Sequence, residues 1–161
     1  MTLPSWLKVK AVPYEEINKV KKILNKGELN TICESAKCPN LMECFSHKTA
    51  TFLILGNICT RSCHFCAVSK GSPNKIDQLE PLKVAKAVIE LELDYVVITS
   101  VTRDDINDGG ASQFADCVKL INKVKPEAFI EVLIPDFKGN KYSISKVVNA
   151  RPTVLNHNME T

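Results

Sequence analysis

The sequence predicts an α/β fold built on a parallel sheet. Four short apolar runs, at residues 51–55, 94–100, 129–134 and from 152 onward, alternate with segments of helical periodicity. Strands of a parallel sheet are buried on both faces and therefore read as continuous apolar runs, and their alternation with helices gives parallel pairing. The chain has 161 residues, of which 45% are apolar and 24% charged, and this is enough material for one such core.

Composition also narrows the class of protein. The longest apolar stretches have the length of strands and are too short for membrane-spanning helices. No apolar signal-peptide core follows the N-terminus, and a net charge of +3 is weak evidence for a nucleic-acid partner. We therefore expect a cytoplasmic protein that binds neither membrane nor nucleic acid.

The first expected element is a helix that begins at Pro13 and ends at Gly27. Proline suits the first turn of a helix and glycine its end. Ile17, Val20 and Leu24 recur at helical spacing, so they predict one apolar face that packs at the edge of the domain.

Three further helices are expected between the later strands. Glu80 and Pro81 begin the first, and Ser143 is the expected N-cap of the third. Each carries one apolar face, formed by Leu82, Ala85, Val88 and Ile89 in the first, by Phe114, Cys117, Val118, Ile121 and Val124 in the second, and by Ile144, Val147 and Val148 in the third. Its place on such a face predicts that Cys117 is a buried, inert thiol.

The other six cysteines fall into two tight triplets. A secreted disulfide scaffold is disfavoured, because the total of seven is odd and no signal peptide is visible. Clustered thiols in a reducing compartment indicate metal binding instead.

The downstream triplet, Cys59, Cys63 and Cys66, lies in the stretch CTRSCHFC, just after the strand expected at residues 51–55. Three thiolates on one loop can hold three corners of an iron–sulfur cube and leave one iron open to a small molecule. The carboxyl end of a parallel strand is where functional loops gather. This loop is therefore the first candidate for the chemistry.

The upstream triplet, Cys33, Cys38 and Cys44, has the spacing C-x4-C-x5-C. Taken alone it leaves two interpretations open. It could hold a second iron–sulfur cluster, or it could hold zinc with His47 as a fourth ligand, although zinc sites prefer closer pairs of cysteines.

The pattern C-x3-C-x2-C, with Phe65 just before its last cysteine, resembles the signature of the radical S-adenosylmethionine (SAM) enzymes. Four stretches, TFLILGNICTRSCHFCAV, CESAKCPNLMEC, VVITSVTRDDINDGGASQFA and LNHNMET, resemble lipoyl synthase over nearly all of the chain. The resemblance implies a partial (β/α) radical-SAM barrel with parallel strands over residues 51–161, which stops after about the fourth strand. An irregular N-terminal extension over residues 1–50 would carry the auxiliary cluster.

The same resemblance implies the cofactors. These are SAM and two 4Fe–4S clusters, one held by Cys59, Cys63 and Cys66 and an auxiliary one held by Cys33, Cys38 and Cys44. The implied activity is that of a sulfurtransferase, which inserts two sulfur atoms into a protein-bound octanoyl chain, with the auxiliary cluster as the sulfur source. The implied partners are octanoylated lipoyl-carrier domains, namely E2 subunits of 2-oxoacid dehydrogenases and the H protein of glycine cleavage, and an electron donor such as ferredoxin or flavodoxin.

Six side chains are candidates for contact with SAM. They are Phe65, Thr99, Ser100, Arg103, Asn156 and Glu160. Thr99 and Ser100 end a strand where the superfamily often has a SAM-binding stretch, although their hydroxyls could equally cap that strand. Arg103 could pair with the carboxylate of SAM, or it could belong to a solvated turn.

The resemblance is incomplete at its far end. The later strands of the family have no counterpart, nor does its C-terminal Arg-Ser-Ser stretch, whose serine completes the auxiliary cluster. We therefore expect a truncated chain that binds iron poorly and turns over little. Two alternatives are another radical SAM sulfur-inserting enzyme and a zinc-stabilised α/β binding module.

Overall fold

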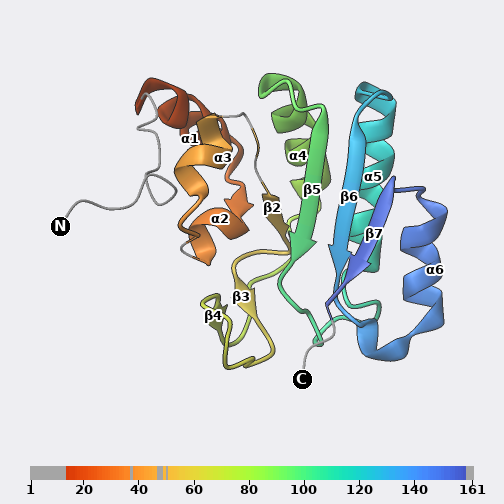
Figure 1. Ribbon diagram of the computed structural model, residues 1–161. Helices are drawn as coiled ribbons and strands as arrows, with labels where there is room; N and C mark the ends of the chain where they lie inside the picture. The colour runs from red at the N-terminus through yellow and green to blue at the C-terminus, as the bar shows by residue number, and fades with distance from the viewer. Residues whose placement is uncertain (1–13, 37, 47–48, 50, 159–161) are drawn as a thin grey trace, which may run out of the picture.

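Five strands form one sheet in the order β1-β2-β5-β6-β7 in the computed structural model (Figure 1), which describes residues 14–36, 38–46, 49 and 51–158. The strands are β1 (Asn30–Thr31), β2 (Thr51–Ile54), β5 (Tyr95–Ser100), β6 (Phe129–Ile134) and β7 (Val154–His157). The β2–β5, β5–β6 and β6–β7 pairs are parallel, and β1 pairs antiparallel with β2. The prediction of an α/β fold with a mostly parallel sheet is confirmed.

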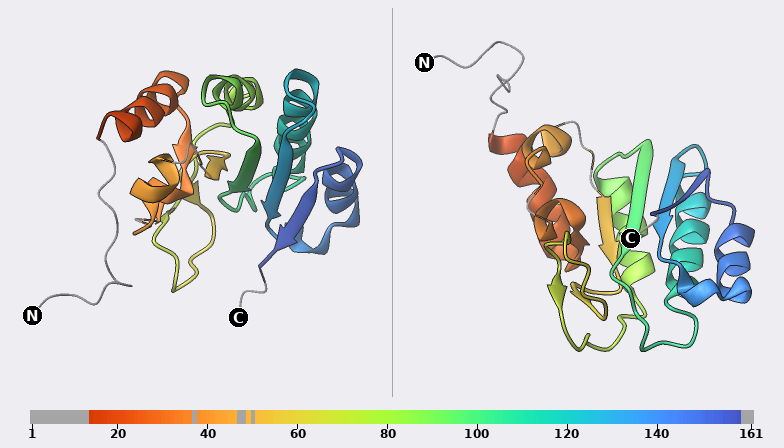
Figure 2. Two further views of the ribbon diagram at one scale, coloured as in Figure 1. Left: turned by 45° about the horizontal axis from the view of Figure 1, so that its top comes forward. Right: turned by 60° about the horizontal axis from the view of Figure 1, so that its bottom comes forward.

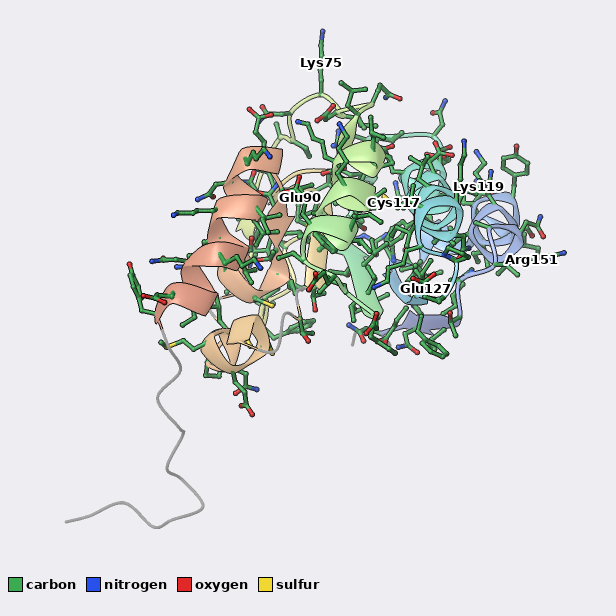
Figure 3. The ribbon with its side chains drawn as sticks, turned by 90° about the horizontal axis from the view of Figure 1, so that it is seen from above. Lys75, Glu90, Cys117, Lys119, Glu127 and Arg151 are labelled. Atoms are coloured by element: carbon green, nitrogen blue, oxygen red, sulfur yellow. The ribbon has the colours of Figure 1, made fainter. Side chains whose placement is uncertain are left out.

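Three helices follow strands of this sheet and lie along one of its faces, as the views in Figures 1, 2 and 3 agree. They are α4 (Glu80–Glu90), α5 (Ala111–Val124) and α6 (Lys141–Asn149), with the short 3-10 helix η2 (Phe137–Gly139) before α6. Helix-facing residues of the strands, such as Val96, Ile98 and Val132, are fully buried. On the opposite face, Tyr95 and Phe129 are exposed, so the described sheet has one covered and one open face.

The segment before β2 is more regular than expected. It contains α1 (Tyr14–Gly27), α2 (Ile32–Ser35) and α3 (Leu41–Ser46) as well as β1. The apolar face predicted for α1 is confirmed, because Ile17, Val20 and Leu24 are buried. The expectation of an irregular segment is wrong, because Thr31 caps α2 by accepting a hydrogen bond from the Glu34 amide, and residues 30–31 pair with Leu53 and Phe52 of the main sheet.

Two expected helix faces are rotated or shortened. In α4, Ala85 and Val88 are buried as predicted, but Leu82 and Ile89 are 43% and 46% exposed. Val84 and Ala87 take their place in the core, because the helix lies along the sheet (Figure 1) and packs against α5 and α1. Val124 at the end of α5 is likewise exposed.

The N-cap expected for α6 is also placed differently. Asn140 caps this helix, and its Oδ1 accepts from the amides of Tyr142 and Ser143 at 3.0 and 3.3 Å. Ser143 lies inside the helix and is buried. The last strand begins at Val154 and not at Pro152. Cys117 is confirmed as a buried thiol, with none of its surface exposed, and it points from α5 towards α4 (Figure 3).

None of the helices in the described residues combines the length and apolarity that crossing a membrane requires. No disulfide joins the seven cysteines, all of which lie in the described residues.

Candidate metal centre

The downstream thiols lie on a loop at the carboxyl edge of the sheet. The chain leaves β2 through a turn at Leu55 and Gly56 and then forms two short strands, β3 (Ile58–Cys59) and β4 (Ser69–Lys70), which pair with each other in parallel. The right-hand view of Figure 2, with this edge brought forward, shows the loop beside the ends of β2 and β5. The thiol loop, residues 57–70, is therefore where the sequence predicts it.

Backbone hydrogen bonds hold the Cys59 sulfur and join Cys63 to Cys66, and all three cysteines are half-buried. The Sγ of Cys59 accepts hydrogen bonds from the amides of Arg61 at 3.4 Å and Thr102 at 3.3 Å. The Cys66 amide donates to the Cys63 carbonyl at 3.2 Å, so these two residues lie one turn apart. Amide hydrogen bonds to sulfur are a feature that tunes iron–sulfur sites.

The loop after β5, residues 101–105, supports the thiol loop through Thr60. The Thr60 amide and hydroxyl both donate to the Thr102 carbonyl, at 3.1 and 2.9 Å. The Asp104 amide donates in return to the Thr60 hydroxyl at 3.1 Å. The position of the thiols therefore depends on the loop of a neighbouring strand.

Arg61 makes a second connection. Its guanidinium donates to both carboxylate oxygens of Asp104, at 2.8 and 3.0 Å, and to both oxygens of Asp136, at 3.0 and 2.7 Å. These hydrogen bonds lower the pKa of Asp104 and lower the pKa of Asp136 to about 2. A residue inside the thiol motif thus joins the loops that follow β5 and β6.

A cavity of about 540 Å³ opens beside the thiol loop. Its lining comes from three places: the thiol loop (Arg61, Cys63, His64, Phe65), the end of β5 (Thr99, Ser100, Thr102), and the ends of β6 and β7 (Leu133, Ile134, Pro135, Asp136, His157, Asn158). The volume is in the range of small-molecule sites. The Oγ of Ser100 is buried and has no hydrogen-bond partner among the described residues, whereas Thr99 donates to the Leu133 carbonyl at 3.1 Å.

Of the six candidates for contact with SAM, the structure brings Phe65, Thr99 and Ser100 together around this cavity. Arg103 does not line it. Its guanidinium is 4% exposed and is bound to the Asp105 carboxylate and the Leu55 carbonyl.

The last two candidates are Asn156 and Glu160. Asn156 donates to Glu131 at 2.7 Å on the open face of the sheet and does not line the cavity. Glu160 lies outside the described residues.

Arg61, Asp136 and His157 also line the cavity, although none of them is among the predicted site residues. Arg61 stands between two cysteines of the motif, and this position is the feature of the sequence that could have indicated a role for it. Asp136 follows β6, and His157 ends β7. Both lie at the carboxyl edge of the sheet, where ligand sites of parallel α/β folds occur. The Nδ1 atom of His157 lies 2.9 Å from the Ile134 carbonyl, which fixes the ring at the rim.

The upstream thiols gather around α2 and α3. Cys33 is buried in α2, and its carbonyl accepts from the Cys38 amide at 3.0 Å. Burial, and then the nearby thiols of Cys33 and Cys38, raise the pKa of Cys44, so the three groups are close enough to interact. His47, the possible zinc ligand, lies outside the described residues.

Each triplet offers three thiols, and thiolates are the ligands that iron–sulfur clusters take from proteins. Within the described residues, no three His, Cys, Asp or Glu side chains are grouped tightly enough to hold one ion.

No protein-family model matches the chain. Curated relatives do match. The lipoyl synthase of Caldicellulosiruptor saccharolyticus is 53% identical over 158 residues, which are 98% of this chain and 55% of the relative. The lipoyl synthase of Alkaliphilus metalliredigens is 58% identical over 158 residues, 98% of this chain and 54% of the relative. That of Aquifex aeolicus is 53% identical over 148 residues, 92% of this chain and 54% of the relative. The resemblance to lipoyl synthase is confirmed, and the chain spans about half the length of these relatives.

Proposed function

We propose that this chain is the N-terminal part of a lipoyl synthase, which inserts two sulfur atoms into a protein-bound octanoyl chain. The identity of more than 50% over 98% of the chain supports this assignment. The observation that carries it is the position of the thiol loop, whose Cys63 borders a cavity of about 540 Å³ at the carboxyl edge of a parallel sheet. We further propose that residues 51–161 form part of a (β/α) radical-SAM barrel and residues 1–50 an extension for the auxiliary cluster.

Cys59, Cys63 and Cys66 would hold a 4Fe–4S cluster in this proposal. When bound, this cluster and SAM would supply the electron and the radical that removes hydrogen from the octanoyl chain. The chain's own residues bind and shield. The amides of Arg61 and Thr102 hold the Cys59 sulfur, and Phe65 forms part of the cavity wall. The Ser100 hydroxyl, which has no hydrogen-bond partner among the described residues, is available to a polar group of the ligand.

Cys33, Cys38 and Cys44 would hold the auxiliary cluster, which serves as the sulfur source. No general base is assigned, because an unactivated C–H bond has no acidic proton to transfer. The proposed substrates are octanoylated lipoyl-carrier domains, such as E2 subunits of 2-oxoacid dehydrogenases and the glycine-cleavage H protein. Ferredoxin or flavodoxin would supply electrons, and the reducing cytoplasm would keep the thiols available.

The proposal is tested by anaerobic reconstitution of the chain with iron and sulfide. We expect iron uptake below two full clusters per chain that still colours the protein brown, and an electron paramagnetic resonance spectrum that, after reduction, changes when SAM is added. Cys63→Ala and Cys38→Ala should each remove roughly half of the bound iron, since each interrupts one cluster. Cys117→Ala is the matched control and should retain all of it, because Cys117 is buried in the core.

One outcome would contradict the proposal, and an activity assay adds a further expectation. A colourless protein with stoichiometric zinc would contradict it and favour a zinc-stabilised binding module. Incubation with SAM, a reductant and an octanoylated carrier should yield little or no lipoyl product from these 161 residues, which span about half of the relatives.

A further inference from the structure

The turn that leads from β2 into the thiol loop has an unusual backbone. Leu55 has a φ of +70° and Gly56 a φ of +93°, so two successive residues adopt the left-handed conformation. A leucine in this region is strained, because its Cβ approaches its own carbonyl, and such strain persists only where neighbouring groups enforce it. Neighbouring groups must therefore hold the Leu55 backbone in this conformation.

Three separate elements do so. The Leu55 amide donates to the Oε2 atom of Glu80 at 2.8 Å, at the start of α4. Its carbonyl accepts from Nη1 of Arg103 at 3.1 Å. Its side chain is 2% exposed and lies against Gly110 at the start of α5, so closely that a Cβ on residue 110 would be 2.1 Å from the leucine Cδ1 atom.

Of the three residues that hold Leu55, Glu80 is the one that places an acidic group in the protein interior. Glu80 is buried, with 7% of its surface exposed. Among the described residues, no basic side chain forms a salt bridge with it. Burial raises the pKa of its carboxyl, and hydrogen bonds from the amides of Leu55 and Gly56 oppose that rise. Burial of a carboxylate costs free energy unless its oxygen atoms accept hydrogen bonds. Those of Glu80 accept from the backbone of the turn.

The turn and the thiols share one support. Arg103, which holds the Leu55 carbonyl, lies between Thr102, whose amide donates to the Cys59 sulfur, and Asp104, which binds Arg61. A movement of the Leu55 peptide would therefore remove the acceptor of Arg103 and disturb the loop on which Cys59 rests.

We propose that Glu80 is a positioning residue for the thiol loop: its buried carboxylate fixes the Leu55–Gly56 turn and, together with the 101–105 loop, the place of the Cys59 sulfur. The inference rests on the proposed function only in taking this loop as the holder of the SAM-binding cluster. Glu80 itself touches none of the reacting groups.

The alternative is that Glu80 only stabilises the start of α4, where any acidic side chain is favourable. Glu80→Asp separates the two roles. It keeps the charge at the first turn of the helix but withdraws the oxygens from the Leu55 amide by one methylene. Glu90→Gln is the matched control, because Glu90 ends the same helix beside α1 and pairs with Lys26 at 3.6 Å (Figure 3).

The first measurement is amide hydrogen exchange of the metal-free chain. In Glu80→Asp we expect exchange at residues 55–59 to be about tenfold faster or more, the size expected for loss of a hydrogen bond to a charged acceptor. Exchange in β5 and β6 should stay at the wild-type rate, and Glu90→Gln should match wild type throughout. Wild-type exchange at residues 55–59 in Glu80→Asp would overturn the proposal. So would a general loss of protection in β5 and β6, which would make Glu80 a determinant of the whole fold.

The second measurement is the spectrum of the reconstituted chain. With equal iron content, Glu80→Asp should show a weaker spectral change on addition of SAM than wild type and Glu90→Gln, and an unchanged response would count against the positioning role. Because the exchange experiment uses the metal-free chain, its result stands even if wild type takes up no cluster. That failure would refute the proposed function and not the role of Glu80 in the turn.

Discussion

Replacement of Gly110 by alanine tests the close packing between the start of α5 and the turn at Leu55. Gly110 has a φ of +92°, and an added Cβ would lie 2.1 Å from Cδ1 and 3.2 Å from Cγ of Leu55. The left-handed backbone alone costs about 1–2 kcal/mol for alanine. Leu55 is buried, so the overlap should add about 1–3 kcal/mol, as overpacking of a core does.

Gly139→Ala is the matched control for this substitution. Gly139 also has a positive φ, +70°, but no atom lies within 4 Å of the position that its Cβ would take. Urea unfolding followed by circular dichroism should show that Gly110→Ala lowers the free energy of unfolding by roughly 2–5 kcal/mol and Gly139→Ala by about 1–2 kcal/mol. Equal losses in the two variants would refute the close packing of Gly110 on Leu55.

Two further predictions concern single side chains. Arg61→Gln removes the guanidinium that holds the pKa of Asp136 at about 2, below its ordinary 3.8. Wild type should therefore be the more stable protein near neutral pH, and its advantage should shrink as the pH falls from about 4 towards 2; a difference in urea midpoint that stays constant over this range would argue against the ion pair. Asn140→Ala should lower the free energy of unfolding by about 1 kcal/mol, because it removes the N-cap of α6. Ser143→Ala, which removes a hydroxyl without a partner among the described residues, should not lower it, and a larger loss there would restore Ser143 as the cap.

The parts of the fold that follow from local pattern could be predicted. Residues 129–134 read as a strand because five of the six are apolar, and the apolar face of α5 follows from helical spacing. The face of α4 could not be fixed in the same way. Leu82 fits the pattern as well as Val84 does, and only the packing of α4 against its neighbours, α5 and α1 among them, decides that Val84 is buried.

The thiols of the candidate site were visible in the sequence because their spacing is local, whereas their supports were not. Arg61 binds carboxylates that lie 43 and 75 residues farther along the chain, and no local pattern connects them. Arg103 looked like a ligand for an anion because a charged residue in a loop is usually exposed. Its burial follows from the left-handed turn at Leu55, for which the sequence has no signal.

The double contact of Arg61 has a thermodynamic consequence. Asp136 forms part of the cavity wall, and Arg61 belongs to the loop that carries Cys59 and Cys63. A ligand that draws Asp136 towards itself would weaken the restraint on that loop and so change the affinity of the thiols for metal. Linkage requires the reverse effect to be equally large: metal held by the thiols would change the affinity of the cavity for that ligand by the same factor. The two sites would then bind as a coupled pair, with Arg61 carrying the coupling energy.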